Sequence, residues 1–174
     1  MFNGKDVILH ATLNRMQRIR LQETLVHMDA LATIYRQVNR DATIEQKNRK
    51  RNYPIGANQR RRMMIKARKK YFNKQPKNAY RRYPVACFRD LMRSHRKFLK
   101  TPKGERGVSI PNAYRKTCIN KYLIHVKNNT LYLPKFEYVE ITESLDGIMD
   151  ANIVRVTVYQ DGENAKIKLR YHPI

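Results

Sequence analysis

The sequence predicts an α+β protein, with a basic α-helical region between a first β-strand and a small antiparallel β-region. Two observations predict this class. Apolar residues recur at helical spacing up to about residue 100, and they alternate as in strands after residue 120. The charge also differs between the two parts of the chain. Residues 47–106 contain 22 of the 37 Lys and Arg and only two acids, whereas residues 137–163 contain seven of the 14 acids. The helical region is therefore suited to a polyanion, and the β-region to ordinary solubility.

Two elements and a loop are predicted before residue 58. Residues 6–13 are short and apolar, which indicates a strand or an extended segment. Residues 14–40 have helical periodicity, and either Thr12 or Asn14 can cap the helix start by accepting a backbone N–H. One continuous apolar stripe on this helix consists of Leu21, Leu25, Met28, Ala32 and Tyr35. Residues 41–57 lack a clean period and contain Pro and Gly, so they are predicted to form a loop.

Two more helices are predicted in the most basic part of the chain. One runs from Asn58, as the N-cap, through Phe72, with a narrow apolar stripe of Met64, Ala67 and Tyr71. The next starts at Pro84, because the first helical turn leaves its N–H groups unpaired and tolerates a residue without one. Its apolar face consists of Val85, Phe88, Leu91, Met92, His95 and Leu99. The segment TPKGERGVSIP that follows is predicted to end it.

The C-terminal part is predicted to be β-structure. Residues 121–126 and 130–134 indicate two strands joined by a turn at KNN, and residues 136–141 alternate as a third. A β-hairpin follows, with strands Ile153–Tyr159 and Lys166–Tyr171 around an Asp-Gly turn. Its first strand is predicted to have one buried and one exposed face, because Val154, Val156 and Val158 alternate with Arg155, Thr157 and Tyr159.

The acid-free stretch of residues 56–84 predicts a polyanionic partner, because a merely solvated face would mix the two signs of charge. A membrane anchor would need a large apolar face or a lipidation signal, and residues 1–10 contain neither. No segment approaches the roughly 18 apolar residues that span a bilayer. Nucleic acid is therefore the predicted partner, with no membrane. The tyrosines among the arginines favour single-stranded or folded RNA over duplex DNA.

Cations would contact the phosphates, and aromatic rings would stack on the bases. Tyr53, Phe72 and Tyr83 are further stacking candidates, and for every ring the alternative is packing beneath the helices. The predicted nucleic-acid-binding residues are Arg49, Lys50, Arg51, Arg60, Arg61, Arg62, Lys66, Arg68, Lys69, Lys70, Tyr71, Tyr80, Arg81, Arg82, Arg93, Arg96, Lys97 and Lys135.

We expect neither catalysis nor a cofactor or metal. Cys87 and Cys118 have no CxxC spacing and favour a reducing compartment, and the five histidines are scattered as surface or hydrogen-bonded core residues. The acids lie mostly on turns and exposed strand positions. Glu137 and Glu140 are three apart, which on a strand places them on opposite faces. A Gly-rich phosphate loop and a GxSxG motif are also missing from the sequence.

The segment NNTLYLPKFEYVEI, residues 128–141, and the hairpin of residues 153–171 resemble parts of the N-terminal half of TnpB proteins. These are transposon-encoded RNA-guided nucleases related to the miniature type V CRISPR effectors. The specific match is Leu131, Leu133, Pro134 and Lys135. The resemblance implies a small antiparallel wedge-type β-barrel with an inserted basic α-helical recognition lobe. Residues 1–13 would be the first strand of the barrel, residues 14–103 the lobe and residues 104–174 the β-rich wedge domain.

The resemblance also implies a function: an RNA-binding, non-catalytic module of an RNA-guided DNA-targeting system. It would hold the guide RNA scaffold and the RNA–DNA heteroduplex or target DNA. The protein would be prokaryotic or viral and cytoplasmic, and it would lie at the nucleoid when bound to its target. The family continues into a RuvC-like domain with three metal-binding carboxylates, whereas this sequence ends at Ile174. A nuclease-free derivative, a fragment and a split protein all stay open.

Three other readings stay open beside that function. A subunit that completes a nuclease chain in trans would expose an apolar patch near Ile167, Leu169 and Ile174. A second copy of this chain is another open partner. A ribosome-associated or ribonucleoprotein assembly protein would share the charge and size. However, extensions that order only on ribosomal RNA lack core stripes, whereas residues 84–99 have a full apolar face.

Overall fold

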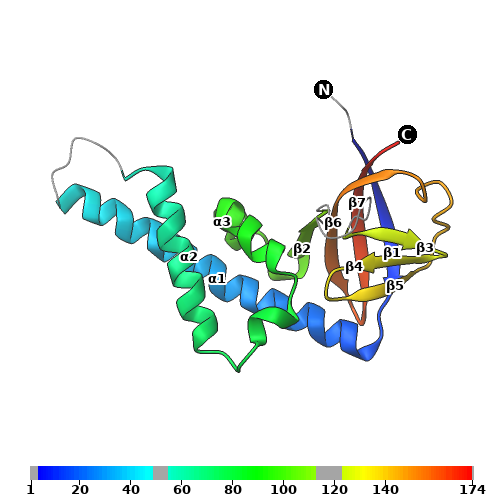
Figure 1. The fold of residues 1–174 in the computed structure, drawn as a ribbon, viewed down its shortest axis with the longest axis horizontal. Helices are drawn as coiled ribbons and strands as arrows, with labels where there is room; N and C mark the ends of the chain where they lie inside the picture. The colour runs from blue at the N-terminus through cyan, green and yellow to red at the C-terminus, as the bar shows by residue number, and fades with distance from the viewer. Residues whose placement is uncertain (1–3, 49–54, 113–122, 174) are drawn as a thin grey trace. The chain divides into compact units, whose positions relative to one another are not determined.

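The computed structural model describes residues 4–48, 55–112 and 123–173. The chain divides into two compact units: a sheet unit, Met1–Leu25 with Lys103–Ile174, and a helical unit, Val26–Pro102. The described residues form three α-helices and a seven-stranded antiparallel sheet (Figure 1), which confirms the predicted α+β class.

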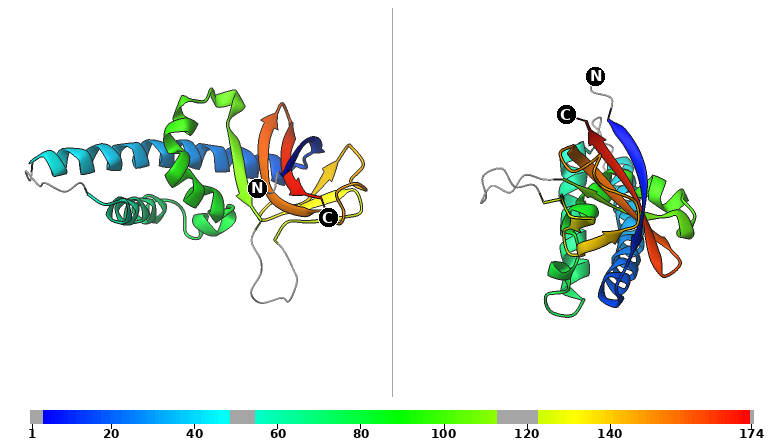
Figure 2. Two further views of the ribbon diagram at one scale, coloured as in Figure 1. Left: turned by 90° about the horizontal axis from the view of Figure 1, so that it is seen from above. Right: turned by 90° about the vertical axis from the view of Figure 1, so that its right-hand side faces the viewer.

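The sheet unit is built around one sheet with the strand order β2-β6-β7-β1-β5-β4-β3, in which every neighbouring pair is antiparallel. Strand β1 lies between β7 and β5, so the first strand joins strands from the C-terminal end of the chain (Figure 2). The sheet is open at β2 and β3 in the described residues, and its closure into a wedge-type barrel stays a prediction. The strands are β1 Lys5–Thr12, β2 Gly107–Pro111, β3 His125–Lys127, β4 Thr130–Leu133, β5 Glu137–Ile141, β6 Asn152–Asp161 and β7 Asn164–His172.

One face of the sheet forms the core of this unit, because apolar residues alternate with polar ones along each strand. The buried apolar residues include Leu9, Val108, Ile110, Leu131, Leu133, Val139, Val156, Val158, Ile167 and Leu169. The hairpin of β6 and β7 turns where predicted. Gly162 has a φ of 61°, a left-handed conformation that glycine adopts without a steric penalty.

Strand β2 lies inside the segment predicted only to end a helix. It pairs with β6 from Gly107 opposite Tyr159 to Pro111 opposite Arg155. A Cβ atom at Gly107 would lie 2.7 Å from Thr157 Cγ2, so the absence of a side chain allows this close approach. The glycine that suggested a break therefore serves strand pairing.

Asn112 connects the two edges of the sheet. Its Nδ2 donates to the backbone oxygen of Ile153 at 2.9 Å, and its Oδ1 accepts the backbone N–H of Ile124 at 2.9 Å. Asn112 directly follows β2 and Ile124 directly precedes β3. The ends of the two edge strands are therefore held together by one side chain.

Two predictions about this sheet are wrong. Val154 was predicted to share the buried face of Val156 and Val158, but it is 36% exposed because the β6–β7 register shifts between Ile153 and Arg155. Ile167 and Leu169 were named for an exposed apolar patch, but both are 0% exposed in the core and cannot belong to one. Ile174, the third residue named for that patch, lies outside the described residues.

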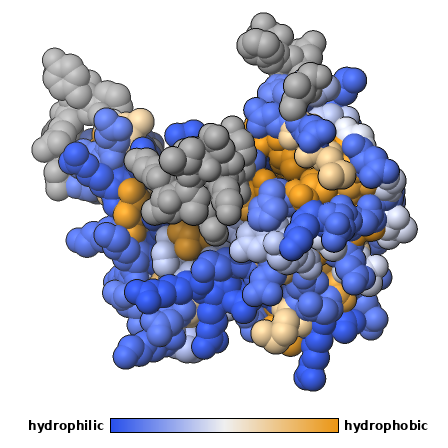
Figure 3. All heavy atoms as spheres, turned by 45° about the vertical axis from the view of Figure 1, so that its right-hand side comes forward, coloured by the Kyte–Doolittle hydropathy of each residue, from blue (hydrophilic) through white to orange (hydrophobic). Residues whose placement is uncertain are grey.

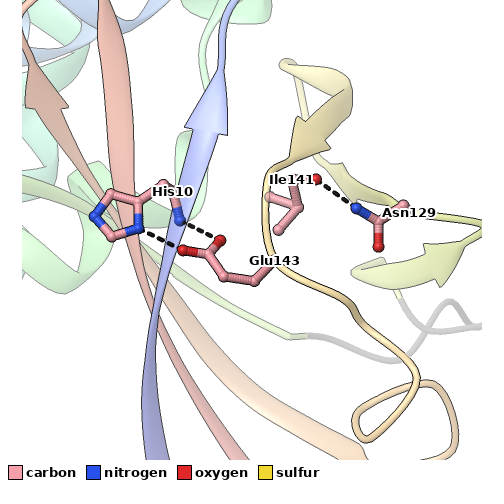
Figure 4. A network of polar contacts seen from close by, with 4 residues as sticks. All are labelled: His10, Asn129, Ile141 and Glu143. Carbon is pink, nitrogen blue, oxygen red and sulfur yellow. Dashed lines mark hydrogen bonds and ion pairs between the residues drawn. The ribbon is translucent and has the colours of Figure 1, made fainter.

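Polar side chains connect β1 to the segment that follows β5 (Figure 4). The Glu143 carboxylate accepts the backbone N–H of His10 at 2.8 Å and also contacts the His10 ring at Nδ1. Partial desolvation favours a higher pKa for the Glu143 carboxyl, but the hydrogen bonds from His10 outweigh it and lower this pKa. In the same region Asn129 Nδ2 donates to the backbone oxygen of Ile141.

The first helix, α1, spans Arg15–Asn48, starting in the sheet unit and continuing into the helical unit. Asn14 caps it as predicted: its Oδ1 accepts the N–H of Gln17 at 2.8 Å, and Gln17 Oε1 accepts the N–H of Asn14 at 3.0 Å. The loop predicted for residues 41–57 is wrong as far as Asn48. Ala42 is fully buried, and Thr43 Oγ1 donates to the backbone oxygen of Asn39 within the helix.

The helical unit also contains α2 Ala57–Asn73, the 3₁₀ turn Ala79–Arg82 and α3 Val85–Lys100. Gly56, not the predicted Asn58, is the N-cap of α2. Pro84 precedes the first residue of α3 as its N-cap. The core comprises Met28, Leu31, Ala32, Tyr35, Met64, Cys87, Phe88, Leu91, His95 and Phe98.

Two buried polar side chains of the helical unit, His95 and Tyr35, are hydrogen-bonded as a core requires. His95 is 4% exposed, and its Nδ1–H donates to the backbone oxygen of Met92 at 2.9 Å. Its Nε2 accepts Asn39 Nδ2 at 3.2 Å. The Tyr35 hydroxyl donates to the backbone oxygen of Phe88 at 3.2 Å. His95 is thus a hydrogen-bonded core histidine, as expected from sequence.

Candidate nucleic-acid interface

The positive charge is concentrated in the helical unit. Val26–Pro102 contains 22 Lys and Arg against four acids, whereas the sheet unit contains 15 against ten. Hydrophilic residues cover most of the face drawn in Figure 3, with smaller apolar areas among them. A charge excess of this size in one unit favours association with a polyanion.

Helix α2 presents a cationic face. Met64 is buried beneath it, while Arg61, Arg62, Lys66, Lys69 and Lys70 are exposed, and the helix contains no acid. The pairs Arg62–Lys66 and Lys66–Lys70 are four residues apart, a spacing at which each like-charge pair costs about 0.2–0.5 kcal/mol of helix stability. The folded unit bears this cost without an acidic residue on the helix to reduce it.

A groove of about 550 Å³ lies between α1 and α3. Arg36 and Arg40 of α1 line it one turn apart, and Arg96 and Lys100 of α3 line it with the same spacing. The remaining lining residues, Asn39, Thr43, Ile44 and Leu99, are uncharged. This α1–α3 groove therefore presents four cations and no carboxylate to a ligand.

A second groove, of about 580 Å³, involves α2 and α3. Arg60 and Arg61 line it from α2, and Arg89 and Arg93 line it from α3 together with Asp90. Arg60 is partly committed to the protein, because its Nη1 donates to the backbone oxygen of Asn39 at 3.1 Å. Guanidinium groups bind phosphate oxygens through paired N–H donors, so both grooves have the chemistry of phosphate sites.

Most of the predicted cations lie where a polyanion could reach them. Those that are exposed are Arg61, Arg62, Lys66, Lys69, Lys70, Arg81, Arg82, Arg93, Arg96 and Lys97 in the helical unit and Lys135 in the sheet unit. Arg49, Lys50 and Arg51, together with Tyr53, lie outside the described residues. Their role as phosphate or base contacts stays a prediction.

Arg68 does not lie where it was predicted to. It is 8% exposed, its guanidinium interacts with the Tyr35 hydroxyl, and its Nη1 has no hydrogen-bond partner in the described part of the chain. Burial raises the pKa of Tyr35 to about 12, against the opposing effect of Arg68. A side chain in this position does not reach a phosphate on the surface.

The aromatic side chains predicted to stack on bases contact one another, mostly edge to face. Phe72 lies at the centre of the cluster, with its ring centroid 5.1 Å from Tyr71, 4.9 Å from Tyr80 and 5.3 Å from Phe88. Tyr71 also contacts His27, with 2.7 Å between its hydroxyl and His27 Nδ1. Tyr71 and Tyr80 are half-buried. The rings pack among the helices, and stacking of their exposed parts on bases stays a prediction.

Sequence reasoning missed four cations of the grooves: Arg36, Arg40, Arg89 and Lys100. The signal for them was present. Arg36 and Arg40 are four residues apart near the end of the predicted first helix, and Arg89, Arg93, Arg96 and Lys100 recur at three or four residues along the third. All four lie outside the acid-free stretch of residues 56–84.

Groups that could support other functions are sparse in the part of the chain that is described. It contains no cluster of three or more His, Cys, Asp or Glu side chains placed to hold a metal ion. None of its helices combines the length and the apolar character needed to cross a membrane. Cys87 is buried, and burial raises the pKa of its thiol, so it does not have the exposed thiolate of a nucleophile.

The chain matches none of the known protein-family models, and none of the curated proteins matches it. The resemblance to TnpB proteins therefore rests on residues 128–141 and 153–171 and stays a prediction.

Arg68→Met is expected to leave the affinity for RNA within about twofold, because the residue is remote from solvent. The free energy of unfolding should stay equal or rise, by up to about 4 kcal/mol, because a packed apolar side chain replaces a buried guanidinium whose Nη1 has no hydrogen-bond partner among the described residues. Tyr35 keeps its own hydrogen bond to Phe88 in this variant. Urea denaturation and fluorescence anisotropy with labelled RNA measure the two quantities. Arg62→Met, on the exposed face, is the matched control and should lose affinity; a loss confined to Arg68→Met would contradict the assignment.

Proposed function

We propose that this chain is an RNA-binding, non-catalytic protein that holds a structured RNA on the cationic helices of its helical unit. The observation that carries the proposal is the exposed face of α2, where five cations face solvent without an acid, beside two arginine-lined grooves. The like-charge repulsion on α2 is removed when phosphates neutralise it, which explains why such a face is stable in a complex.

The likeness to TnpB proteins suggests the type of RNA. A guide RNA and its heteroduplex with target DNA are recognised by shape and backbone, with sequence choice left to base pairing. The cations of α2 and of the two grooves suit this task, because contacts to phosphate position a nucleic acid without reading its sequence. Within this proposal the chain is the RNA-holding module of an RNA-guided DNA-targeting system, and any cleavage belongs to another chain.

The packed core of the helical unit favours this function over that of an assembly protein. Tyr35, Phe88 and Leu91 are each 1% exposed or less, so the cationic helices have a core of their own. Extensions that order only on ribosomal RNA do not bury such residues without it.

RNA binding is expected to be steeply salt-dependent. If the α2 face and the two grooves neutralise roughly 6–10 phosphates, the affinity for a structured RNA should fall by about 10³–10⁵ between 50 and 200 mM salt. Fluorescence anisotropy with a labelled hairpin RNA, repeated at several salt concentrations, measures the slope of the logarithm of affinity against the logarithm of salt. An RNA affinity that does not change with salt would contradict the proposal.

The RNA that copurifies with the chain identifies the system. The chain is expressed with its native genomic flanks, purified, and its bound RNA is sequenced. One abundant RNA that maps beside the gene is the result expected for a guide-binding protein. Ribosomal RNA, or a heterogeneous population, would support the ribonucleoprotein assembly function instead.

A further inference from the structure

Three rings lie side by side on the face of the sheet opposite its buried apolar residues. They are His125 on β3, Tyr132 on β4 and Tyr138 on β5. In the strand register His125 lies opposite Tyr132, and Tyr132 lies opposite Tyr138, so the three form one row across three strands. Tyr138 is 44% exposed.

The core of the sheet does not explain this row. The neighbouring residues Leu131, Leu133 and Val139 point to the opposite face, and each of their side chains is at most 1% exposed. The hydrophobic contribution of β4 and β5 to folding comes from these inward residues. Cross-strand aromatic pairs support strand pairing, and this row in addition places rings at the surface of the sheet.

The three rings contact one another and form one continuous aromatic surface. The rings of His125 and Tyr132 are nearly parallel, with 4.9 Å between centroids and an interplanar angle of 17°. Tyr138 meets both at steep angles, with centroids 5.2 Å from Tyr132 and 6.0 Å from His125. The backbone behind the row is fixed, because the buried Gln17 donates to the carbonyl oxygen of Tyr138 at 2.8 Å.

The charges around the row indicate an anionic ligand. Lys127 Nζ lies 5.8 Å from the centroid of the Tyr138 ring, and Lys135 is exposed in the turn that joins β4 to β5. Glu140 lies on the same face, in a row with Thr130 and Lys127. Flat rings beside ammonium groups match the two parts of a nucleotide, since the base stacks and the phosphate pairs with the cation.

We propose that His125, Tyr132 and Tyr138 form a stacking platform for unpaired bases of the bound RNA, with Lys127 and Lys135 contacting the adjacent phosphates. This proposal rests on the proposed RNA-binding function and adds a second, distinct mode of contact. The helices bind backbone phosphates of structured RNA, whereas the platform selects a single-stranded segment, because paired bases do not present their faces.

The test compares two labelled RNAs, a single-stranded decamer and a blunt duplex of equal charge, by fluorescence anisotropy. Tyr138→Ala should weaken binding of the single strand by about tenfold, roughly 1.4 kcal/mol, and leave binding of the duplex within about twofold. Tyr138→Phe keeps the ring and should bind both RNAs as the unmodified chain does. The slope of affinity against salt should not change in either variant, because no phosphate contact is removed.

Met149→Ala is the matched control, since it truncates an apolar side chain that is 53% exposed elsewhere in the sheet unit. It should not affect either RNA. Tyr132→Ala should repeat the loss seen with Tyr138→Ala. Because Tyr132 is half-buried, circular dichroism checks its folding, and the exposed Tyr138 carries the test alone if Tyr132→Ala does not fold.

The outcomes separate the platform from the proposed function. An unmodified chain that binds neither RNA overturns the proposed function and the platform together. A chain that binds both RNAs, with Tyr138→Ala unchanged toward the single strand, overturns the platform alone. Quenching of tyrosine fluorescence by an oligosaccharide or a proline-rich peptide, but not by the single strand, would also overturn it, because the row would then serve another ligand.

Discussion

Replacing Arg62, Lys66 and Lys69 together by glutamine is expected to lower the affinity for structured RNA by about two orders of magnitude, at roughly 1 kcal/mol for each lost phosphate contact. All three side chains are exposed on the face of α2 opposite the buried Met64. The slope of affinity against salt should become shallower by about two to three, because each cation that contacts a phosphate contributes close to one.

The same triple variant should fold at least as well as the unmodified chain. Glutamine is a good helix former, and the substitution removes the like-charge pairs Arg62–Lys66 and Lys66–Lys70, each worth about 0.2–0.5 kcal/mol. A thermal melt followed by circular dichroism should therefore show an equal or higher midpoint. Lost affinity without lost stability separates a binding role from a structural one.

The matched control removes three exposed cations from the sheet unit, as Lys5→Gln, Arg15→Gln and Lys103→Gln. It changes the net charge of the chain by the same amount. We expect it to lower RNA affinity by less than about threefold, through the loss of long-range attraction alone. Equal losses in the two triple variants would mean that RNA responds to total charge, and the α2 face would lose its assignment as an interface.

The sequence predicts the helical elements well and the burial of single charged residues poorly, and Arg68 shows why. It lies four residues after Met64 and three before Tyr71, so helical spacing alone places it on the buried stripe. The sequence analysis placed Ala67 on that stripe and Arg68 among the nucleic-acid-binding cations. Burying a guanidinium is costly. The cost is accepted where the Tyr35 hydroxyl reaches the side chain, and no local pattern shows that contact.

The elements that sequence analysis missed depend on contacts between residues that are far apart in the sequence. The last turns of α1 are polar and lack a period, but Arg60 hydrogen-bonds to Asn39 and Thr43 there from another helix. Strand β2 is short and begins with Gly107 and ends with Pro111, and only its pairing with β6 makes it a strand. The ring row of the sheet unit follows from alternation within β4 and β5, but its assembly requires the register of three strands.

Phe88→Ala is expected to lower the free energy of unfolding by about 3–5 kcal/mol, because a fully buried aromatic side chain leaves a cavity. Phe88 lies beside Phe72, Tyr80 and Tyr83, with ring centroids 5.3 to 6.4 Å away. A unit of this size has a total stability of about 4–12 kcal/mol by the usual value per residue, so the loss is a large fraction of it. Urea denaturation followed at 222 nm measures the change.

Val26→Ala is the control for Phe88→Ala, since Val26 is 67% exposed on α1 in the same unit and its truncation should change stability by less than about 0.5 kcal/mol. The variant also tests whether the cationic helices are ordered before RNA arrives. RNA at about 100 times its dissociation constant should restore roughly 2.7 kcal/mol to Phe88→Ala, so helical signal lost in the free variant returns on titration. The unmodified chain, by contrast, should unfold cooperatively without RNA. If it is instead helical only when RNA is added, the core around Phe88 does not preform the interface, and a ribonucleoprotein assembly protein becomes the better description of this chain.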